Sequence, residues 1–200
     1  MEPTRIAVFV SGGGTNLQAL LDAEKSGQLH SGKIVLVLSN QPGAFALQRA
    51  QKAGVATEVV QANAPDFEEQ VLRLTEKYQI QLIILAGFLS ILSADFVSRF
   101  PKRILNVHPS LIPSFCGEGF YGLHVHEAAL RYGVKLTGAT VHYVNEITDG
   151  GEILLQKAVP VEPGDTPRLL QRRVMEQAEW VLLPQAAEMV SKRLKRERGE

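Results

Sequence analysis

The stretch I-L-N-V-H-P-S-L-I-P at residues 104–113 sets the plan of the chain. Its first half is apolar and β-prone, whereas Pro109 and Pro113 allow neither a strand nor a helix to continue through them. These residues predict a buried strand that ends at a rigid loop. Because side chains two residues apart in a strand point to the same face, Asn106 and His108 should project together from the end of this strand.

An amide beside an imidazole suits chemistry at a carbonyl group. The amide of Asn106 can donate a hydrogen bond to an oxyanion as it forms, and the imidazole of His108 can move a proton near neutral pH. These tasks belong to acyl transfer, so both residues are candidate catalytic residues. The same pattern also fits a strand that leaves the core with two satisfied polar side chains, and this stretch alone does not decide between the two interpretations.

Upstream of this stretch, β-prone apolar runs alternate with helical patterns. Strands are predicted at residues 5–10, 33–38, 56–60 and 81–86, and helices from residue 15 and at residues 44–53, 66–78 and 93–98. Strands that alternate with helices indicate a parallel sheet covered by helices on both faces, which is an α/β fold.

Downstream of it the pattern changes. Residues 134–144 and 152–161 are predicted strands joined by a loop rather than by a helix, which indicates antiparallel pairing. The sheet is therefore predicted to be mixed and mostly parallel. The sequence D-T-P at residues 165–167 is typical of a helix start. Apolar residues follow it at helical spacing, namely Leu170, Val174, Ala178 and Val181. A long C-terminal helix should close the domain.

The composition indicates one domain, residues 1–200, that binds small molecules. Two hundred residues with 45% hydrophobic content can form one sizeable core. Lys plus Arg and Asp plus Glu are equal at 21 each, so the sequence offers no basic surplus for a nucleic acid or an anionic membrane.

Cysteine usage and hydropathy indicate the compartment. The single cysteine, Cys116, excludes an intramolecular disulfide framework, and the first residues show no signal-peptide pattern. No apolar run approaches the roughly 20 residues that span a bilayer. We therefore expect a cytoplasmic protein, present as a monomer or a homodimer.

A glycine loop, S-G-G-G at residues 11–14, joins the first predicted strand to the first helix. Such a loop brings backbone N–H groups and the positive end of a helix to an anion, here a phosphate. The dinucleotide-binding pattern needs a glycine where Leu17 stands and an acidic residue at residues 39–41, and both are missing. No Gly-Lys-Ser/Thr follows either, which excludes a nucleotide-triphosphate loop of the common kind.

The loop that remains suits a single phosphate group. Gly13 and Gly14 would offer backbone N–H groups, and Thr15 and Asn16 would offer side-chain donors. A tight turn that only packs the helix on the strand is the alternative interpretation.

A second loop could complete the catalytic group. Residues 145–151 read N-E-I-T-D-G-G, and their last three residues permit a sharp turn with Asp149 at its tip. A carboxylate near His108 would favour the imidazolium form and raise the pKa of His108. An Asp-Gly pair is also a common turn sequence without any catalytic role.

Four motifs in order make nearly the whole chain resemble the folate-dependent phosphoribosylglycinamide formyltransferase family of purine biosynthesis. They are S-G-G-G-T-N at residues 11–16, L-A-G-F-L-S-I-L at residues 85–92, the stretch at residues 104–113, and T-D-G-G-E-I-L at residues 148–154. The resemblance implies a Rossmann-like formyltransferase fold. It also implies transfer of a formyl group from the co-substrate 10-formyltetrahydrofolate to the amine of glycinamide ribonucleotide. The amine would attack directly through a tetrahedral intermediate, with Asn106, His108 and Asp149 as the catalytic residues.

The resemblance also assigns the substrate contacts. Residues 1–100 would form a phosphate-binding half, in which Gly14, Thr15 and Asn16 hold the ribonucleotide phosphate, and residues 101–200 a folate-binding and catalytic half. The residues assigned to folate are Leu89, Ser90, Ile91, Leu92, Asn106, Glu146, Ile147 and Thr148. For Leu85, Leu89 and Leu92, packing in the core is the alternative.

The family's ribose-binding acid lies on the C-terminal helix. Counting back from Pro184 assigns it to Glu179, whereas counting forward from Asp165 gives a position one residue away. A solvent-exposed helix face would explain Glu176 and Glu179 equally simply.

Three features depart from the family. Some members carry an arginine where Ser90 stands or near Ala64, and neither is present, so the glutamate tail of folate must be recognised differently. Residues 114–122 form a longer, glycine-containing loop that could act as a lid. Trp180 stands where histidine is usual.

Other functions fit parts of the pattern. His124 and His126 form an H-x-H pair, but the surrounding residues look like the start of a helix, on which i and i+2 diverge, so no metal is expected. Formyltetrahydrofolate hydrolase and methionyl-tRNA formyltransferase share the Asn, His and Asp trio. The length of the chain argues against both, and its neutral charge argues against the tRNA enzyme. A ligand-binding protein of the same fold without catalysis is the alternative from a different class.

Overall fold

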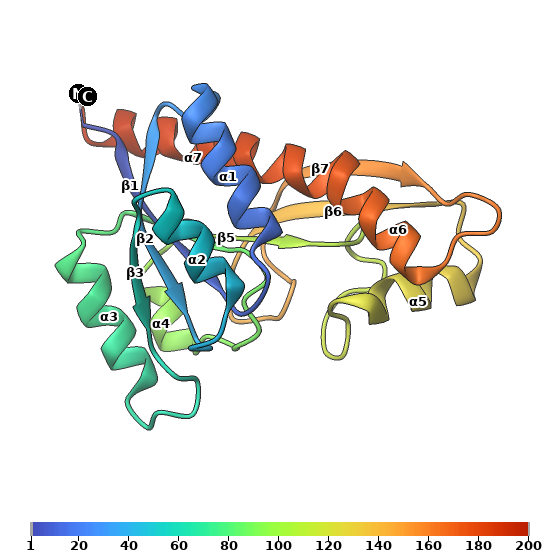
Figure 1. Cartoon of the computed structure of the whole chain (residues 1–200), viewed down its shortest axis with the longest axis horizontal. Coiled ribbons are helices and arrows are strands. Elements are labelled where there is room, and N and C mark those ends of the chain that lie inside the picture. Colours follow the sequence, from blue (N-terminus) through green and yellow to red (C-terminus); the bar gives the residue numbers. More distant parts are fainter. Residues whose placement is uncertain (1, 200) are drawn as a thin grey trace.

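A computed structural model describes residues 2–199 as a seven-stranded sheet with helices on both faces (Figure 1). The strand order is β3-β2-β1-β4-β5-β6-β7, in which β1 to β5 run parallel and β6 and β7 pair antiparallel. The predicted mixed, mostly parallel sheet is therefore confirmed.

Each predicted strand and helix is present with its ends within two residues of the prediction, apart from the C-terminal helix. The strands are β1 Thr4–Val10, β2 Gly32–Ser39, β3 Ala56–Val59, β4 Leu82–Leu85, β5 Ile104–His108, β6 Leu136–Tyr143 and β7 Ile153–Pro160. The helices are α1 Thr15–Ser26, α2 Phe45–Lys52, α3 Phe67–Lys77, α4 Ala94–Ser98, α5 Leu123–Tyr132, α6 Pro167–Val174, the π-helical segment η1 Met175–Glu179 and α7 Trp180–Glu197.

The alternation of side chains along the strands creates two apolar cores. On β1, Ile6 and Val8 face the core that includes residues of α1, α2, α6 and α7, whereas Ala7 and Phe9 face the core that includes residues of α3 and α4. All four side chains are fully buried. Such a strand, apolar on both faces, is what a parallel sheet covered on both sides requires.

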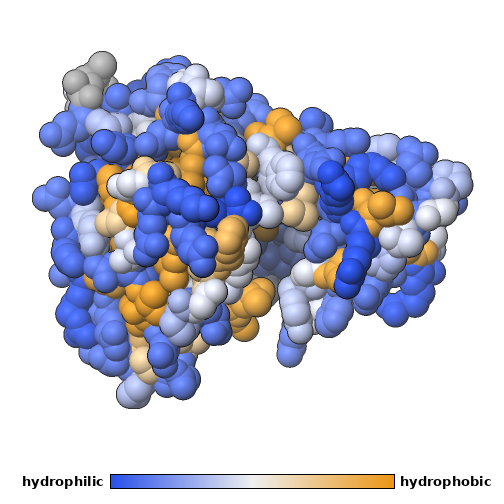
Figure 2. Space-filling model, in the orientation of Figure 1, coloured by the Kyte–Doolittle hydropathy of each residue, from blue (hydrophilic) through white to orange (hydrophobic). Residues whose placement is uncertain are grey.

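The order of the strands reverses between β1 and β4. In doubly wound sheets, ligands bind at such a switch point, beyond the carboxyl ends of the strands. The segments after β1 and β4 contact each other there. The Ser11 N–H donates to the Gly87 carbonyl at 3.2 Å, and the Leu89 N–H donates to Oγ of Ser11 at 2.8 Å. The glycine loop and the predicted folate segment are thus joined directly. Figure 2 shows the surface hollowed between the part that carries α1–α4 and the part that carries α5 and α6.

The prediction of one continuous C-terminal helix is wrong at residues 175–179. The π-helical segment η1 separates α6 from α7 there. A π-helical turn holds more residues than an α-helical turn, so the face that packs on the sheet shifts. Val181 is consequently 44% exposed instead of buried, and Leu182 and Leu183 take its place in the core.

Between residues 2 and 199, no helix combines the length and the apolar character that crossing a bilayer requires.

Candidate active site

The side chains of Asn106, His108 and Asp149 meet at the carboxyl end of β5. Nδ1 of His108 lies 3.3 Å from Oδ2 of Asp149, and Nδ2 of Asn106 lies 3.4 Å from Oδ1 of the same carboxylate. The side chains of His108 and Asp149 are only 5% and 8% exposed. Residues that are 43 positions apart in the sequence therefore share one buried polar cluster.

A tight turn places Asp149 in this cluster. Asp149 has a φ of 55°, in the left-handed region where Asp is among the few enriched residues besides glycine. Gly150 donates its N–H to the Ile147 carbonyl at 2.9 Å, and a Cβ on Gly151 would lie 1.7 Å from the Tyr143 carbonyl oxygen. A Cβ on Gly150 would likewise lie 2.6 Å from Cγ2 of Ile147, so the two glycines of the D-G-G sequence suit the turn that aims Asp149 at His108.

His142 is a further member of the cluster that the sequence did not reveal. It faces Asn106 directly across the antiparallel pair of β5 and β6. Its Nδ1 donates to the Tyr143 carbonyl at 2.9 Å, and its Nε2 lies 3.1 Å from Nδ2 of Asn106 and 3.6 Å from Oδ1 of Asp149. His142 thus contacts both the Asn106 amide and the Asp149 carboxylate from β6 and holds these two groups in place. Only the register of β5 on β6 could have identified it.

Both ring nitrogens of His108 face acceptors. Nε2 donates to the Phe115 carbonyl at 2.8 Å, because a carbonyl can only accept, and Nδ1 faces the carboxylate of Asp149. Burial lowers the pKa of His108, and the charge of Asp149 and the Phe115 carbonyl oppose this shift without reversing it. The expected upward push from Asp149 is present, but the expected net rise in pKa is wrong because desolvation is the larger effect.

Asp149 is set to be ionised. Burial raises its pKa, but the contact with His142, the hydrogen bond from the Gly117 N–H at 2.9 Å and the charge of His108 together bring the pKa below its usual range. A carboxylate at neutral pH stabilises a proton on Nδ1 of His108 whenever His108 takes one.

The loop at residues 114–122 lies against this cluster. Its Phe115 carbonyl accepts a hydrogen bond from His108, and its Gly117 N–H donates one to Asp149. The Phe115 ring packs against Phe120 and Tyr132, with ring centroids 6.4 and 6.0 Å apart. The loop therefore contacts the candidate catalytic groups through its backbone, which is the placement a lid requires.

The glycine loop ends in a left-handed residue. Gly14 is the N-cap of α1 with a φ of 71°, and within residues 2–199 neither the Gly13 nor the Gly14 N–H has a hydrogen-bond acceptor. Thr15 and Asn16 begin α1, and Nδ2 of Asn16 donates to Oε2 of Glu179 at 2.7 Å. Free amides at a helix N-terminus are the arrangement that binds an anion.

Glu179 lies in the interior rather than on a solvent-exposed face. Its side chain is 6% exposed, and burial raises its pKa to about 7 although the hydrogen bond from Asn16 opposes the rise. Glu176 does lie on an exposed face, where it accepts a hydrogen bond from Arg172. Interpreting both acids as solvent-exposed is therefore wrong for Glu179, which adjoins the glycine loop.

The apolar side chains in and just before the predicted folate segment, residues 89–92, divide between the core and the surface. Leu85 and Leu92 are each 8% exposed and belong to the core, so the core interpretation holds for these two. Leu89 and Ile91 are 66% and 83% exposed, which is unusual for such large apolar side chains. Ser90 accepts a hydrogen bond from Nδ2 of Asn40 at 2.7 Å, which fixes the segment to the end of β2.

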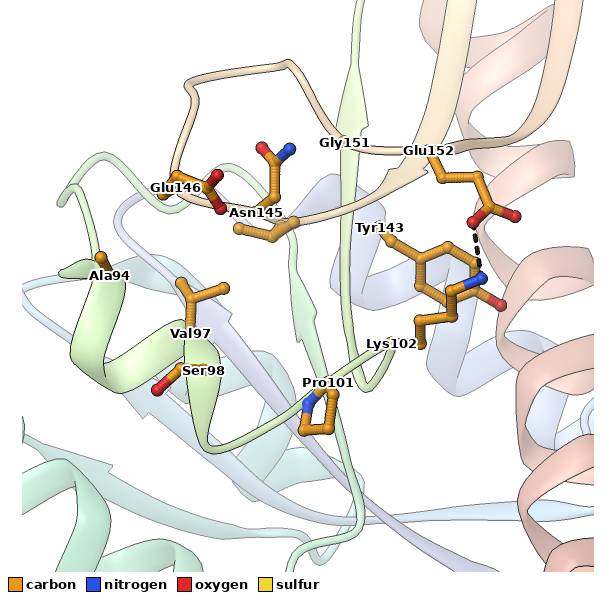
Figure 3. A pocket seen from close by; sticks show the side chains of 11 residues that line it. Ala94, Val97, Ser98, Pro101, Lys102, Tyr143, Asn145, Glu146, Gly151 and Glu152 are labelled. Carbon is orange, nitrogen blue, oxygen red and sulfur yellow. Dashed lines mark ion pairs between the residues drawn. The ribbon is translucent and has the colours of Figure 1, made fainter.

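A cavity of about 300 Å³ lies between α4 and residues 143–152 (Figure 3). Asn145 and Glu146, at the start of the predicted folate loop, face α4 across it, and an ion pair between Lys102 and Glu152 closes one side at 2.6 Å. No member of the catalytic trio lines this cavity, so it adjoins the folate loop without reaching the polar cluster.

The two histidines of the H-x-H pair diverge. The His124 ring lies 5.0 Å from Tyr121, whereas His126 is fully buried, and burial lowers the pKa of His126 to about 4. No cluster of three His, Cys, Asp or Glu side chains suited to a metal occurs in the part of the chain that the structure describes.

The doubly wound sheet has a glycine loop with free amides at its switch point and a buried amide, imidazole and carboxylate at the end of β5, an arrangement typical of α/β group-transfer enzymes. Residues 4–186 match the formyl transferase family, and the chain belongs to this family. It is 40% identical over 176 residues to phosphoribosylglycinamide formyltransferase of Escherichia coli, covering 86% of this chain and 80% of that protein. The structure of glycinamide ribonucleotide transformylase 1 from Symbiobacterium toebii matches with a TM-score of 0.88 and 38% identity, covering 95% of this chain and 88% of that one.

A larger protein also contains this sequence type. The chain is 42% identical over 191 residues to the trifunctional purine biosynthetic protein adenosine-3 of Gallus gallus, covering 94% of this chain but only 18% of that protein. The chain thus spans less than a fifth of that relative. The resemblance deduced from the four sequence motifs, and the fold that it implies, are confirmed.

Proposed function

We propose that the protein transfers a formyl group from 10-formyltetrahydrofolate to the amine of glycinamide ribonucleotide. The observation that carries the proposal is the cluster of Asn106, His108 and Asp149 within 3.4 Å contacts, close in the fold to an anion loop with free amides. Membership of the formyl transferase family supports the same reaction.

The reaction requires no covalent enzyme intermediate. The substrate amine attacks the formyl carbon, and the carbonyl oxygen becomes an oxyanion that accepts hydrogen bonds from Asn106 and protonated His108. The intermediate collapses when the bond between the formyl carbon and N10 of the folate breaks. The proton lost by the amine reaches N10 through a water molecule held by Asp149, whose charge also stabilises the imidazolium form of His108.

The hydrogen bonds of His108 indicate which nitrogen acts. Nδ1 faces Asp149, so Nε2–H is the group that can donate to the oxyanion. Nε2 donates to the Phe115 carbonyl at 2.8 Å. The formyl oxygen must therefore replace the Phe115 carbonyl, which requires the loop at residues 114–122 to shift during the reaction.

The substrates would occupy neighbouring sites. The phosphate would bind the amides of Gly13 and Gly14 with Thr15 and Asn16, and the ribose hydroxyls would reach Glu179, which Asn16 already contacts at 2.7 Å. The pteridine would lie along Leu89, Ser90, Ile91 and the backbone of Leu92, whose side chain is buried in the core. It would also lie against Asn106 and the loop formed by Glu146, Ile147 and Thr148. No metal takes part in this scheme.

Ultraviolet absorbance of the deformylated folate tests the proposal. Purified protein with 10-formyltetrahydrofolate should release it only when glycinamide ribonucleotide is added. Release without the amine would instead assign a hydrolase, and binding of both ligands without release would assign a non-catalytic binding protein. Either result would contradict the proposed transferase.

A further inference from the structure

Helix α2 donates hydrogen bonds to two consecutive backbone carbonyl groups of the glycine loop, those of Gly12 and Gly13. The Ala46 N–H donates to the Gly12 carbonyl at 3.0 Å, and Nε of Arg49 donates to the Gly13 carbonyl at 2.8 Å. Both donors lie on α2, one turn apart. The backbone of the loop is thus tied to a helix that does not itself belong to the proposed phosphate site.

The planar peptide bond converts these two contacts into control over the phosphate donors. In a trans peptide, the carbonyl of one residue and the N–H of the next point in opposite directions. A hydrogen bond that draws the Gly12 carbonyl towards α2 therefore turns the Gly13 N–H away from α2. Arg49 does the same for the Gly14 N–H by holding the Gly13 carbonyl. Neither N–H has an acceptor within residues 2–199.

Arg49 is itself fixed in place by several contacts. Its Nη1 donates to Oε1 of Gln18 on α1 at 3.1 Å, and its guanidinium carbon lies 5.0 Å from the centroid of the Phe45 ring. The contact between the loop and α2 is close, because a Cβ on Gly14 would lie 2.6 Å from Cβ of Ala46. Arg49 therefore connects α1, α2 and the loop as one rigid unit.

We infer that Arg49 is a positioning residue that orients the Gly13 and Gly14 peptide planes so that their N–H groups bind the substrate phosphate. The inference rests on the proposed function for the phosphate site and adds the residue that orders it. Arg49 acts through the Gly13 carbonyl, by hydrogen bonding, rather than by presenting its charge to the phosphate.

Two substitutions separate hydrogen bonding from charge. In Arg49→Gln, the amide nitrogen is bonded to Cδ just as Nε of arginine is, so a donor remains at the same place without the charge. In Arg49→Met, a methyl group stands at that place, so both donor and charge are lost. A role in positioning predicts that Gln rescues binding, whereas a direct contact between charge and phosphate predicts that Gln and Met are equally impaired.

The readouts are the KM for glycinamide ribonucleotide and its Kd measured by calorimetry in the absence of folate. Arg49→Met should raise both the KM and the Kd for glycinamide ribonucleotide about ten-fold, the size expected for one hydrogen bond involving a charged group. Arg49→Gln should remain within about three-fold of the wild type. The KM for formyl folate should not change, and neither should binding of glycinamide riboside, which lacks the phosphate. Gln48→Met, an exposed change on the same helix, is the matched control.

The outcomes distinguish the two proposals. If the wild type binds the ribonucleotide but transfers no formyl group, the proposed reaction fails while the calorimetric comparison still tests Arg49. Equal affinities for the wild type and Arg49→Met would overturn the positioning role. So would equal losses in Arg49→Gln and Arg49→Met, or an equal loss of riboside binding.

Discussion

The backbone carbonyl of Phe115 accepts a hydrogen bond from Nε2 of His108 at 2.8 Å, so a loop residue occupies the donor that the proposed reaction assigns to the formyl oxygen. The neighbouring Gly117 N–H donates to Asp149 at 2.9 Å, which means that the same loop satisfies both groups. Backbone contacts of this kind can be exchanged for substrate contacts without leaving a buried polar group unpaired.

Removal of the carboxylate should loosen this loop. In Asp149→Ala the Gly117 N–H loses its acceptor, so amide hydrogen exchange across residues 114–122 should accelerate roughly ten-fold, as expected for about 1.4 kcal/mol of lost local stability. Exchange in α5 should not change. Mass spectrometry of peptides from both regions checks this, and unaltered exchange in the loop would show that Asp149 does not hold it.

Asn106→Ala and His108→Ala should each lower kcat by about a hundred- to a thousand-fold, roughly 3–4 kcal/mol, because each removes one donor to the oxyanion. KM values should change far less, since the ground-state carbonyl carries little charge. Steady-state kinetics with both substrates provides the measurement, with the exposed Asn63→Ala as control. Near-normal turnover in His108→Ala would remove the basis of the mechanism.

Asp149→Asn should move the alkaline limb of the pH–rate profile to lower pH. Turnover requires protonated His108, so the rate falls as pH rises through the pKa of His108. Burial already lowers that pKa, and the charge of Asp149 is the largest of the effects that oppose the shift. Without the charge, His108 loses its proton at still lower pH. A profile of kcat/KM that keeps its alkaline limb in Asp149→Asn would contradict the electrostatic role.

His126 should make the protein less stable in acid. The pKa of His126 falls from 6.5 to about 4 in the folded state, so the unfolded chain binds the proton more readily. Above pH 6.5, His126 is neutral in both states and does not destabilise the fold. As the pH falls from 6.5 towards 4, the unfolded chain takes up the proton first, so the free energy of unfolding decreases. Relative to wild type, His126→Leu should gain up to about 3 kcal/mol of unfolding free energy across this window. Urea titrations at pH 7 and pH 4 test it, with the exposed His124→Leu as control.

Local sequence rules predicted much of the fold and part of the site. The positions of Asn106 and His108 on one strand follow from side-chain alternation, and the convergence of Asp149 on them was expected from the family resemblance. His142 could not be predicted, because its place opposite Asn106 depends on the register of β6. The direction in which the pKa of His108 shifts could not be predicted either, since desolvation depends on everything packed around the ring.

The C-terminal helix shows a different limit. An α-helical period fits the apolar residues as far as Ala178, and no proline or glycine between Pro167 and the end of the π-helical segment signals that segment. The wider turn is stabilised by tertiary contacts, among them the hydrogen bond from Asn16 to buried Glu179. Propensity along one helix contains no information about such a partner.

Glu179→Gln should raise the free energy of unfolding at alkaline pH and lower the affinity for glycinamide ribonucleotide. The pKa of Glu179 rises from 4.5 to about 7 on folding, so the stabilising contribution is complete below pH 4.5 and is lost as pH rises through 7. Glutamine stays neutral at every pH and can still accept the hydrogen bond from Asn16. The variant should therefore match the wild type near pH 4.5 and exceed its unfolding free energy by up to about 3 kcal/mol at pH 8.

The same variant should bind glycinamide ribonucleotide more weakly, because a carboxylate accepts hydrogen bonds from ribose hydroxyls more strongly than an amide does. The KM for formyl folate should stay unchanged. Glu176→Gln, on the exposed face of the same segment, should show neither the gain in stability at pH 8 nor the loss of binding. Denaturant titrations at both pH values together with calorimetry test the pair. If Glu179→Gln is no more stable than the wild type at pH 8, a buried, charged Glu179 is not what destabilises the protein there.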